Sequence, residues 1–455
     1  MQWYEKLDFT QGALYEVIAQ GIAQAVRTGE LEPGQQLPPQ RFLAKVIGCT
    51  VGTVSRAYKL ADSMGLLHST TGSGSYVNPQ HPFGFAIPES DGSHVINLSI
   101  NTPLLQTRSR TIGEQLTTLG QHLTLAPSLM DYQVNEGAKR HRQVLLDWYK
   151  QAGLDAALDN LCITHGVQHG VALSFSCFTQ PGDTVLAEAI SYPGLKPLAE
   201  RFGIRLLPVE IDHEGMVPEA LERHCRQALP RLLYCNPRFH NPTSSQMSDG
   251  RKQAIAQIAR RHQLMVLEDD VLAHFGPVST PIYNFYPERT IYLSSVSKSL
   301  APGLRIGIMV AEPSILQVLS QALRLDSWMA SPITAELACQ WIESGVAAEL
   351  QKSDRQEIEA RAQLLAPLRK HYQLECHAGS PHGWLHLPER LCAETVAEEL
   401  KQDGVLVKPA SDFVVNPEQP CNAIRFSLTA PLSRSELAEG LTRIEARLTR
   451  SAVAV

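Results

Sequence analysis

The sequence predicts an α/β protein: a large domain with a mainly parallel sheet, preceded by a small helical module that ends in a hairpin. At 455 residues the chain is too long for one ordinary core, so we expect two or three domains. From about residue 96 onward, short apolar runs alternate with longer helical patterns, which is typical of strands joined by helices. Residues 9–77 have a different texture, with three helical stretches and a Gly/Ser turn.

The composition is that of a globular protein without a membrane segment. Hydrophobic residues make up 44% of the chain, and the net charge of -6 indicates no overall surface for nucleic acid or anionic membranes. No apolar run approaches the ~18 residues of a membrane span, and the start "MQWYEKLDFTQ" is unlike a signal peptide. Nine scattered cysteines without a C-x-x-C pair favour reduced thiols over disulfides or zinc. We therefore expect a cytoplasmic protein without a metal site.

The first 77 residues predict three helices and a hairpin. The stretch "ALYEVIAQGIAQAVRTGEL" carries an apolar helical stripe from Leu14 to Val26, and "EPGQQLPP" ends it. Two short helices follow in "QRFLAKVIGCTVGTVSRAYKLADSMG", joined at Gly48, and "LLHSTTGSGSYV" has two apolar ends around a Gly/Ser turn. Residues 79–95 are rich in Pro, Gly and polar residues and are predicted to be a linker.

In the large domain, polar residues follow the predicted strands "DTVLAEA", "RLLYCN", "LMVLEDD" and "TIYLSS". Ligands of such sheets collect at the carboxyl ends of the strands. Four segments place unusual groups there. "ITHGVQHG" sets free amides between a strand and a helix, where they can hold a phosphate or simply form an ordinary turn. "YCNPRFHNPTS" aims Asn241 between prolines, and "VLEDDVLAHF" ends a strand with Asp269 and Asp270, a site or a helix cap.

The fourth segment, "SSVSKSLAPGLRIG", supplies the amine of Lys298 together with hydroxyls and a guanidinium. A lysine amine forms a Schiff base with an aldehyde. A buried aspartate can keep a pyridine nitrogen protonated, while hydroxyls, arginine and helix-start amides bind phosphate. Together these groups suit pyridoxal 5′-phosphate (PLP).

The stretch from about residue 130 to 430 resembles the fold-type I, class I aminotransferases. The resemblance rests on seven segments in the family's order: "DYQVNEGAKRHR", "GVQHG", "PGDTVLAEAISYPG", "NPRFHNPT", "LEDD", "SVSKSLAPGLRIG" and "IRFSLTAP". It implies a fold-type I PLP-dependent transferase-like fold, with a large domain at residues 96–310 and a small domain at 311–455. The strands "CHAGSPHGWLHL" and "GVLVKPASDF" fit the small domain.

The resemblance also implies a role for each matching residue. Lys298 would form the Schiff base with PLP, and Asp269 would pair with the pyridinium nitrogen. The further cofactor contacts implied are a ring hydrogen bond from Asn241, stacking by Tyr192, phosphate binding by Ser295, Arg305 and the amides of Gly166, Val167 and Gln168, and a reach by Tyr132 to the phosphate of a neighbouring subunit. Arg425 would bind the carboxylate of a substrate or effector, with a strand-edge salt bridge as the alternative.

Three positions depart from the family's pattern. The usual tyrosine after the aspartate, which donates to the ring oxygen, is replaced by Val271 or Leu272. Losing that donor should make the Schiff base hold its proton more tightly. The usual glycine after "NPT" is Ser244, and the usual leucine before Arg142 is His141. These departures argue against efficient transamination, though not against PLP binding.

Residues 1–78 resemble the winged helix-turn-helix of the GntR superfamily, through "GELEPGQQLP", "TVSRAY" and the "GSG" wing. Such a module places its second motif helix in the major groove. The residues implied to contact DNA are Arg41, Thr50, Val51, Gly52, Thr53, Arg56, Thr71, Gly72, Ser73 and Gly74. Six basic and six acidic side chains balance within residues 1–78, so one module should bind DNA weakly. We therefore expect a dimer to read paired half-sites.

A GntR-type winged helix joined by a linker to an aminotransferase-like domain resembles the MocR-type transcriptional regulators over nearly the whole chain. This resemblance implies a bacterial, PLP-dependent homodimer that binds a double-stranded DNA operator. Its aminotransferase-like part would sense a small amine, an amino acid or a B6 vitamer through Lys298. Two alternatives remain open from the sequence: an active class I aminotransferase that carries a DNA-binding module, and a DNA-binding protein that keeps the PLP fold only as a dimerisation scaffold.

Overall fold

The computed structural model describes residues 3–7, 9, 13–27, 30–31, 34–63, 66–70, 74–77, 95–104, 108–121, 126–416 and 421–453. The chain forms two units, one within residues 1–89 and the other within 90–416 and 421–455. Nearly all of the predicted linker, 79–95, lies outside the described residues. Among the helices described, none is long and apolar enough to cross a membrane.

The N-terminal unit contains the three helices and the hairpin that the sequence predicts. Its elements are the 3₁₀ turn η1 (Trp3–Lys6), helices α1 (Leu14–Arg27), α2 (Gln40–Ile47) and α3 (Val51–Ser63), and strands β1 (Leu67–Thr70) and β2 (Gly74–Val77). Apolar side chains spaced along the helices, including Ile18, Ile22 and Val54, form one core. Gly48 has a φ of 78° and permits the tight turn between α2 and α3.

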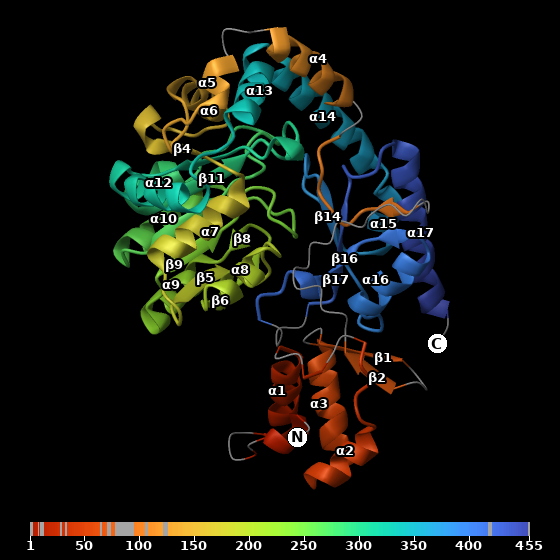
Figure 1. Ribbon diagram of the computed structural model, residues 1–455. Helices are drawn as coiled ribbons and strands as arrows, with labels where there is room; N and C mark the ends of the chain where they lie inside the picture. Colours follow the sequence, from red (N-terminus) through yellow and green to blue (C-terminus); the bar gives the residue numbers. More distant parts are fainter. Residues whose placement is uncertain are drawn as a thin grey trace. The chain divides into compact units, whose positions relative to one another are not determined.

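The larger part of the second unit is built around a seven-stranded mixed sheet (Figure 1). Its order is β4 (Leu161–Thr164), β12 (Gly307–Val310), β11 (Thr290–Ser295), β10 (Met265–Asp269), β9 (Leu232–Cys235), β5 (Thr184–Glu188) and β6 (Arg205–Val209). Neighbouring strands are parallel except at β12, which runs antiparallel to both β11 and β4. The carboxyl ends of the parallel strands therefore meet at one edge, as predicted.

Helices cover both faces of this sheet. One core joins the sheet to α7 (Val167–Phe178), α8 (Leu195–Arg201) and α12 (Pro313–Ser327). On other parts of the sheet, separate cores include α6 (Lys139–Lys150), α9 (Pro218–Ala228), α10 (Asp249–Arg261), α11 (Ile282–Phe285) and α13 (Pro332–Glu343). Helices α4 (Arg108–Gln121) and α5 (Ala126–Met130) contact α13, and β7 (Ile211–Asp212) pairs with β8 (Gly215–Met216). The result is a three-layer α/β/α arrangement.

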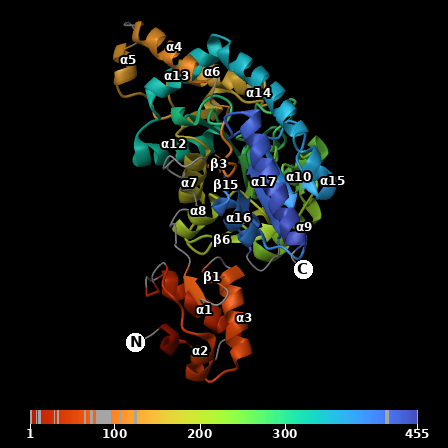
Figure 2. The same ribbon diagram turned by 90° about the vertical axis from the view of Figure 1, so that its right-hand side faces the viewer.

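The C-terminal part of this unit has its own small sheet. Strands β13 (Leu374–Glu375), β14 (His382–His386), β17 (Ala423–Ser427) and β16 (Lys408–Pro409) pair antiparallel in that order. The helices here are α14 (Val346–Gln363), α15 (Ala366–His371), α16 (Ala393–Gln402) and α17 (Arg434–Val453). Figure 2 shows α17 beside α16, and both contact the parallel pair β3 (Ile96–Asn97) and β15 (Val405–Leu406).

Residues 95–104, which we call the leading segment, begin at the last residue of the predicted linker. The segment begins with β3, and the N–H groups of Ile96 and Leu98 donate to the carbonyls of Gly404 and Leu406. The carbonyl of Leu98 accepts from the N–H of Ser427, at the end of β17. These hydrogen bonds hold the leading segment against the small sheet, next to the end of β17.

Candidate functional site

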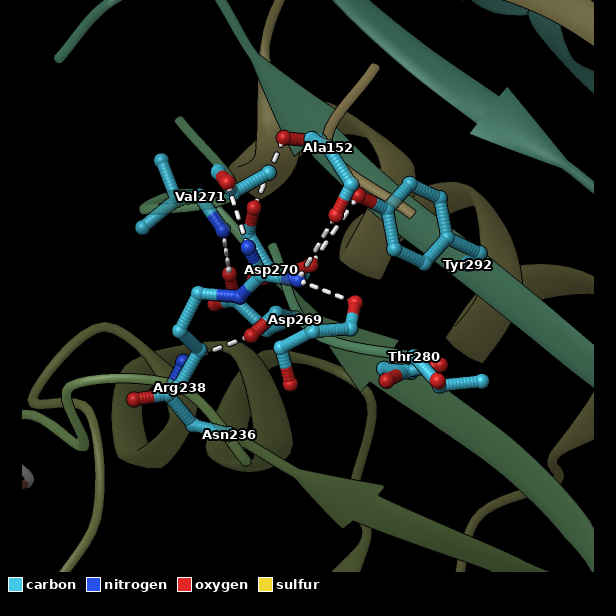
Figure 3. Close-up of polar contacts among 12 residues, drawn as sticks. Ala152, Asn236, Arg238, Asp269, Asp270, Val271, Thr280 and Tyr292 are labelled. Atoms are coloured by element: carbon cyan, nitrogen blue, oxygen red, sulfur yellow. Dashed lines mark hydrogen bonds and ion pairs between the residues drawn. The ribbon is translucent and has the colours of Figure 1, made fainter. Parts of the chain in front are cut away.

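Asp269 lies at the carboxyl end of β10, where the sequence predicts the pyridine-binding carboxylate (Figure 3). Its Oδ2 accepts a hydrogen bond of 2.6 Å from the hydroxyl of Tyr234, and its Oδ1 accepts from the N–H of Val271 at 3.3 Å. Burial raises the pKa of Asp269 to about 6, while these two donors act in the opposite direction. A cation placed against this carboxylate would favour its ionised form.

The neighbouring Asp270 has entirely different partners. Its Oδ1 lies 3.1 Å from Nε of Arg238, and its Oδ2 accepts from the hydroxyl of Tyr292 at 3.1 Å. Arg238 also donates to the backbone carbonyl of Ala152 (Figure 3) and to that of Ala273. Asp270 is therefore a partner in a buried structural ion pair, whereas Asp269 is the carboxylate with no cation within ion-pair distance among the residues described.

The two adjacent aspartates provide a matched pair of variants. Asp270→Asn should lower the free energy of unfolding by about 3–5 kcal/mol, because it leaves the buried charge of Arg238 without a counter-charge. Asp269→Asn should change it by about 1 kcal/mol or less, because the amide oxygen can accept from the N–H of Val271 while the NH₂ group donates to the hydroxyl oxygen of Tyr234. Urea unfolding of both variants without PLP measures the difference. Equal losses would contradict the division of roles.

Lys298 follows β11 and is partly buried. Its Nζ donates to the backbone carbonyl of Asn101 at 2.6 Å, and no carboxylate of the described residues lies within 4.0 Å of it. Burial lowers its pKa to about 8; the nearby cations Arg425 and Arg305 add to this effect, and Asp269 opposes it. A larger fraction of this amine is therefore unprotonated at neutral pH than for an exposed lysine, as nucleophilic attack requires.

Arg425 lies on β17 and is 5% exposed. Its Nη2 donates to the carbonyl of Ser99, its Nη1 donates to Oδ1 of Asn241 at 3.4 Å, and its Nε has no hydrogen-bond partner. The guanidinium carbon lies 5.5 Å from the ring centroid of Phe413. β17 is an inner strand of the small sheet, and Arg425 has no carboxylate partner within 4.0 Å among the described residues. The alternative of a strand-edge salt bridge is therefore not what the structure shows.

The predicted phosphate-binding residues converge where β4 leads into α7. Gly166 has a φ of 98°, and a Cβ atom there would lie 2.8 Å from Nη2 of Arg305. Arg305 donates from Nη2 to the carbonyl of His165 at 2.8 Å. Val167 begins α7, and Ser295 ends β11. A glycine, an arginine and the start of a helix lie together here and could form a cradle for an anion.

Of the remaining predicted cofactor residues, Tyr192 and Asn241 hydrogen bond to neighbouring side chains, whereas Tyr132 is exposed. The hydroxyl of Tyr192 donates to Oε1 of Gln168 at 3.4 Å, and the N–H of Asn241 donates to Oδ1 of Asn236 at 2.9 Å. Tyr132 is 75% exposed, and its ring contacts Trp328 at 5.2 Å between centroids. Tyr132 is therefore open to solvent in this chain.

Two departures from the family's pattern now have a structural account. Ser244 adopts the left-handed conformation, with a φ of 61°, which glycine occupies without strain. Its Oγ accepts from the N–H of His377 at 3.0 Å, a contact that a glycine cannot make. Leu272 is buried against Phe239 and Ile358, and Val271 packs beside them. Neither position supplies a hydroxyl.

Several residues that contact the site were not predicted from the sequence. Tyr234 lies inside the apolar run "RLLYCN" and reads as core, although its hydroxyl reaches Asp269. Asn236 donates to the carbonyl of Asp269 at 2.6 Å. Asn101 and His382 hydrogen bond to each other at 2.9 Å although 281 positions separate them. Asn236 precedes a proline, as Asn241 does in "NPRFHNP", and this repeat could have identified it. No sequence pattern near Tyr234, Asn101 or His382 predicts their contacts.

The groups present fit PLP. A nucleophilic amine of lowered pKa, a buried carboxylate without a cation and an anion cradle are the three kinds of group that the aldehyde, the ring nitrogen and the phosphate need. The Nε of Arg425, buried and without a partner, leaves a donor for a further anion.

In the N-terminal unit, the start of α3 is accessible. Thr50 caps the helix, because its Oγ1 accepts from the N–H of Thr53 at 3.1 Å. The exposed residues at the predicted DNA-binding positions are Arg41, Thr50, Val51, Gly52, Arg56 and Gly74, while Thr53 is half-buried. The Arg56 guanidinium lies 3.9 Å from the ring centroid of Tyr15. Thr71, Gly72 and Ser73 lie outside the described residues.

The chain is similar to both regulators and enzymes. Residues 93–444 match the class I and II aminotransferase family, and residues 14–77 match the gntR family of bacterial regulatory proteins. An uncharacterised HTH-type transcriptional regulator of Bacillus subtilis, YdeF, is 28% identical over 97% of this chain and 96% of its own length. The 2-aminoadipate transaminase of Thermus thermophilus is 29% identical over 69% of this chain and 80% of its own length.

Solved structures agree with the fold. The α-aminoadipate aminotransferase LysN of Thermus thermophilus has a TM-score of 0.71 and 26% identity, and the match covers 80% of this chain and 94% of that one. The kynurenine aminotransferase of Pyrococcus horikoshii has a TM-score of 0.73 and 24% identity over 80% and 92% of the two chains. The chain therefore belongs to the class I and II aminotransferase family and carries a GntR-family helix-turn-helix region at its N-terminus, the organisation of MocR-type regulators.

Proposed function

We propose that this protein is a PLP-dependent transcriptional regulator whose aminotransferase-like unit senses a small amino acid. Bound to Lys298, PLP would supply an electrophilic carbon that can exchange the lysine for the amine of an effector. Asp269 would hold its charge at the ring nitrogen, and Arg305 with the amides at the start of α7 would bind the phosphate. Arg425 would grip the effector's carboxylate.

The observation that carries the proposal is how two cations are held. Nζ of Lys298 and Nη2 of Arg425 both donate to carbonyls of the leading segment, those of Asn101 and Ser99. Neither cation has a carboxylate within 4.0 Å among the described residues. A charged ligand is a stronger acceptor than a neutral carbonyl. A carboxylate at Arg425 would therefore compete with the carbonyl of Ser99, which belongs to the segment that follows the linker.

This competition gives a physical route from the site to the DNA-binding unit. Release of the two carbonyls would loosen the leading segment, and the linker continues from its start to the helix-turn-helix region. Ligand binding can shift such an equilibrium only by its difference in affinity between the two states. A coupling of about 1–3 kcal/mol would change DNA affinity by several-fold to a hundredfold.

We propose that the protein acts as a homodimer, for two reasons. Exposed large apolar side chains occur on α4, at and just after the end of α5, and from the end of α12 to the start of α13; they include Leu116, Met130, Tyr132, Leu325, Trp328 and Ile333. Such a surface is typical of a contact between subunits. Two helix-turn-helix regions on one dimer would also supply the phosphate contacts that a single module of zero net charge lacks. The reduced thiols of a cytoplasmic protein fit this role.

The test is to titrate the PLP-loaded protein onto its operator with and without amino acids, B6 vitamers and simple amines, and to follow fluorescence anisotropy of labelled DNA. We expect at least one amino acid to bind and change the DNA affinity without being transaminated. Unchanged affinity with every compound would contradict the sensor. A visible band that bleaches with an amino acid and returns with a 2-oxo acid would instead indicate an active aminotransferase.

The rate at which Lys298 captures added PLP should rise with pH to about 8 and then level off. Only the unprotonated amine attacks an aldehyde, and the pKa of Lys298 is lowered to about 8. A lysine with the ordinary pKa of about 10.4 would keep gaining rate well above pH 9. Stopped-flow absorbance of PLP-free protein measures the profile. Arg425→Leu should move the midpoint upward, because it removes a cation that lowers this pKa; an unmoved midpoint would contradict the coupling.

A further inference from the structure

Asn101, in the leading segment, contacts two residues of the site. It is 9% exposed, and its backbone carbonyl accepts from Nζ of Lys298 at 2.6 Å. Its side-chain amide lies 2.9 Å from Nδ1 of His382, on β14. Two residues earlier, the carbonyl of Ser99 accepts from Arg425. Asn101 therefore contacts Lys298 directly and lies two positions from Ser99, the residue that contacts Arg425.

The hydrogen bonds of His382 fix which way the amide of Asn101 points. Nε2 of His382 lies 3.1 Å from the carbonyl of His240, and a carbonyl can only accept, so Nε2 carries the proton. Burial lowers the pKa of His382 to about 3, and Arg425 adds to this effect, so the ring is neutral and Nδ1 has no proton. Nδ1 must then accept a hydrogen bond. The NH₂ group of Asn101 faces the ring, and Oδ1 faces away from it.

This leaves an acceptor without a donor. Oδ1 of Asn101 is buried and has no hydrogen-bond partner among the described residues. Buried polar atoms in native proteins are nearly always paired, so an unpaired one next to a binding site requires an explanation. The amide cannot turn to satisfy Oδ1, because turning would set its oxygen against the bare Nδ1 of His382. A ligand that brings a donor to this point would pair Oδ1.

We infer that Asn101 is a specificity-determining residue that accepts a hydrogen bond from the effector while Arg425 holds the effector's carboxylate. This inference rests on the proposed function and narrows it. Besides its carboxylate and the amine that replaces Lys298, the effector carries a further hydroxyl, amide or ammonium donor. A ligand of the same shape with a methyl group there would leave Oδ1 unpaired and bind less well.

The experiment compares isosteric amino acids that differ by one donor. The pairs are threonine with valine, serine with 2-aminobutyrate, and asparagine with leucine, titrated into the PLP-loaded full-length protein by isothermal calorimetry. For at least one pair, the member with the donor should bind about tenfold more tightly. In the Asn101→Leu variant the two members of each pair should bind about equally, and PLP should still be retained. A merely structural role would weaken both members of a pair equally and leave their ratio unchanged.

Asn97→Ala is the matched control. Asn97 lies in the same segment, and its Oδ1 accepts from the N–H and the hydroxyl of Ser99, so it orders the segment without contacting either cation in the structure. This variant should keep the preference for donors. Wild-type protein that binds both members of every pair equally, or Asn101→Leu that keeps the preference, would overturn the role of Asn101 alone. Wild-type protein that binds none of the six would overturn the proposed amino-acid sensing as well.

Discussion

Lys298→Ala should give a folded protein that neither retains PLP nor changes its DNA affinity when amino acids are added. The variant removes the amine that attaches the cofactor and the donor to the carbonyl of Asn101. Gel filtration followed by a visible spectrum measures retained PLP, and anisotropy of labelled operator measures the response. We expect the response to fall from several-fold or more to none.

The fold should survive this substitution. Burial lowers the pKa of Lys298 below its value in the unfolded chain, so its charged form is disfavoured in the folded protein at every pH below about 8. That unfavourable contribution disappears in the alanine variant at neutral pH. A melting temperature close to that of the wild type would therefore confirm that loss of PLP has a local cause.

The Lys298→Arg variant tests whether PLP retention requires the primary amine or only a positive charge at this position. It keeps a cation near Asn101 but cannot form a Schiff base at neutral pH. The arginine variant should fail to retain PLP in the same way as the alanine variant. If either variant still responded to amino acids, the PLP fold would be a scaffold for dimerisation, and sensing would reside elsewhere.

The fold was predictable because its signals are local. Apolar runs of four to six residues that end in polar ones marked β5, β9, β10 and β11, and parallel pairing set their carboxyl ends together. The antiparallel direction of β12 had no such signal. Strand direction depends on how the chain returns to the sheet after the loop at Arg305, and a four-residue apolar run reads the same both ways.

The site was only partly predictable because several of its contacts are made by backbone groups or by residues far apart in the sequence. "LEDD" predicted a carboxylate at Asp269, but only the structure shows that Asp270 belongs to Arg238. The carbonyls of Ser99 and Asn101 have no sequence signal, since any residue carries a carbonyl. The pairing of Asn101 with His382 depends on how the leading segment lies against the small sheet. Local patterns cannot carry that information.

Arg425→Leu should weaken effector binding by about 30-fold to several thousandfold, the equivalent of about 2–5 kcal/mol for truncating one partner of a buried charged hydrogen bond. The guanidinium is buried, has no carboxylate partner among the described residues, and keeps an unpaired Nε. Calorimetric titration of PLP-loaded protein measures the loss. PLP should still be retained, because Lys298, Asp269 and the phosphate cradle are unchanged.

The stability of this variant distinguishes a ligand-binding arginine from a structural one. Burial lowers the pKa of Arg425 to about 10, which means that the folded protein disfavours its charge throughout the neutral range. Replacing it with an apolar side chain should therefore leave the free energy of unfolding unchanged or raise it. Arg425→Lys keeps the charge but not the planar fork, so it should recover only part of the affinity. A destabilised Arg425→Leu protein with normal effector affinity would mean that this arginine serves the fold through Ser99 and Asn241, and that another group binds the carboxylate.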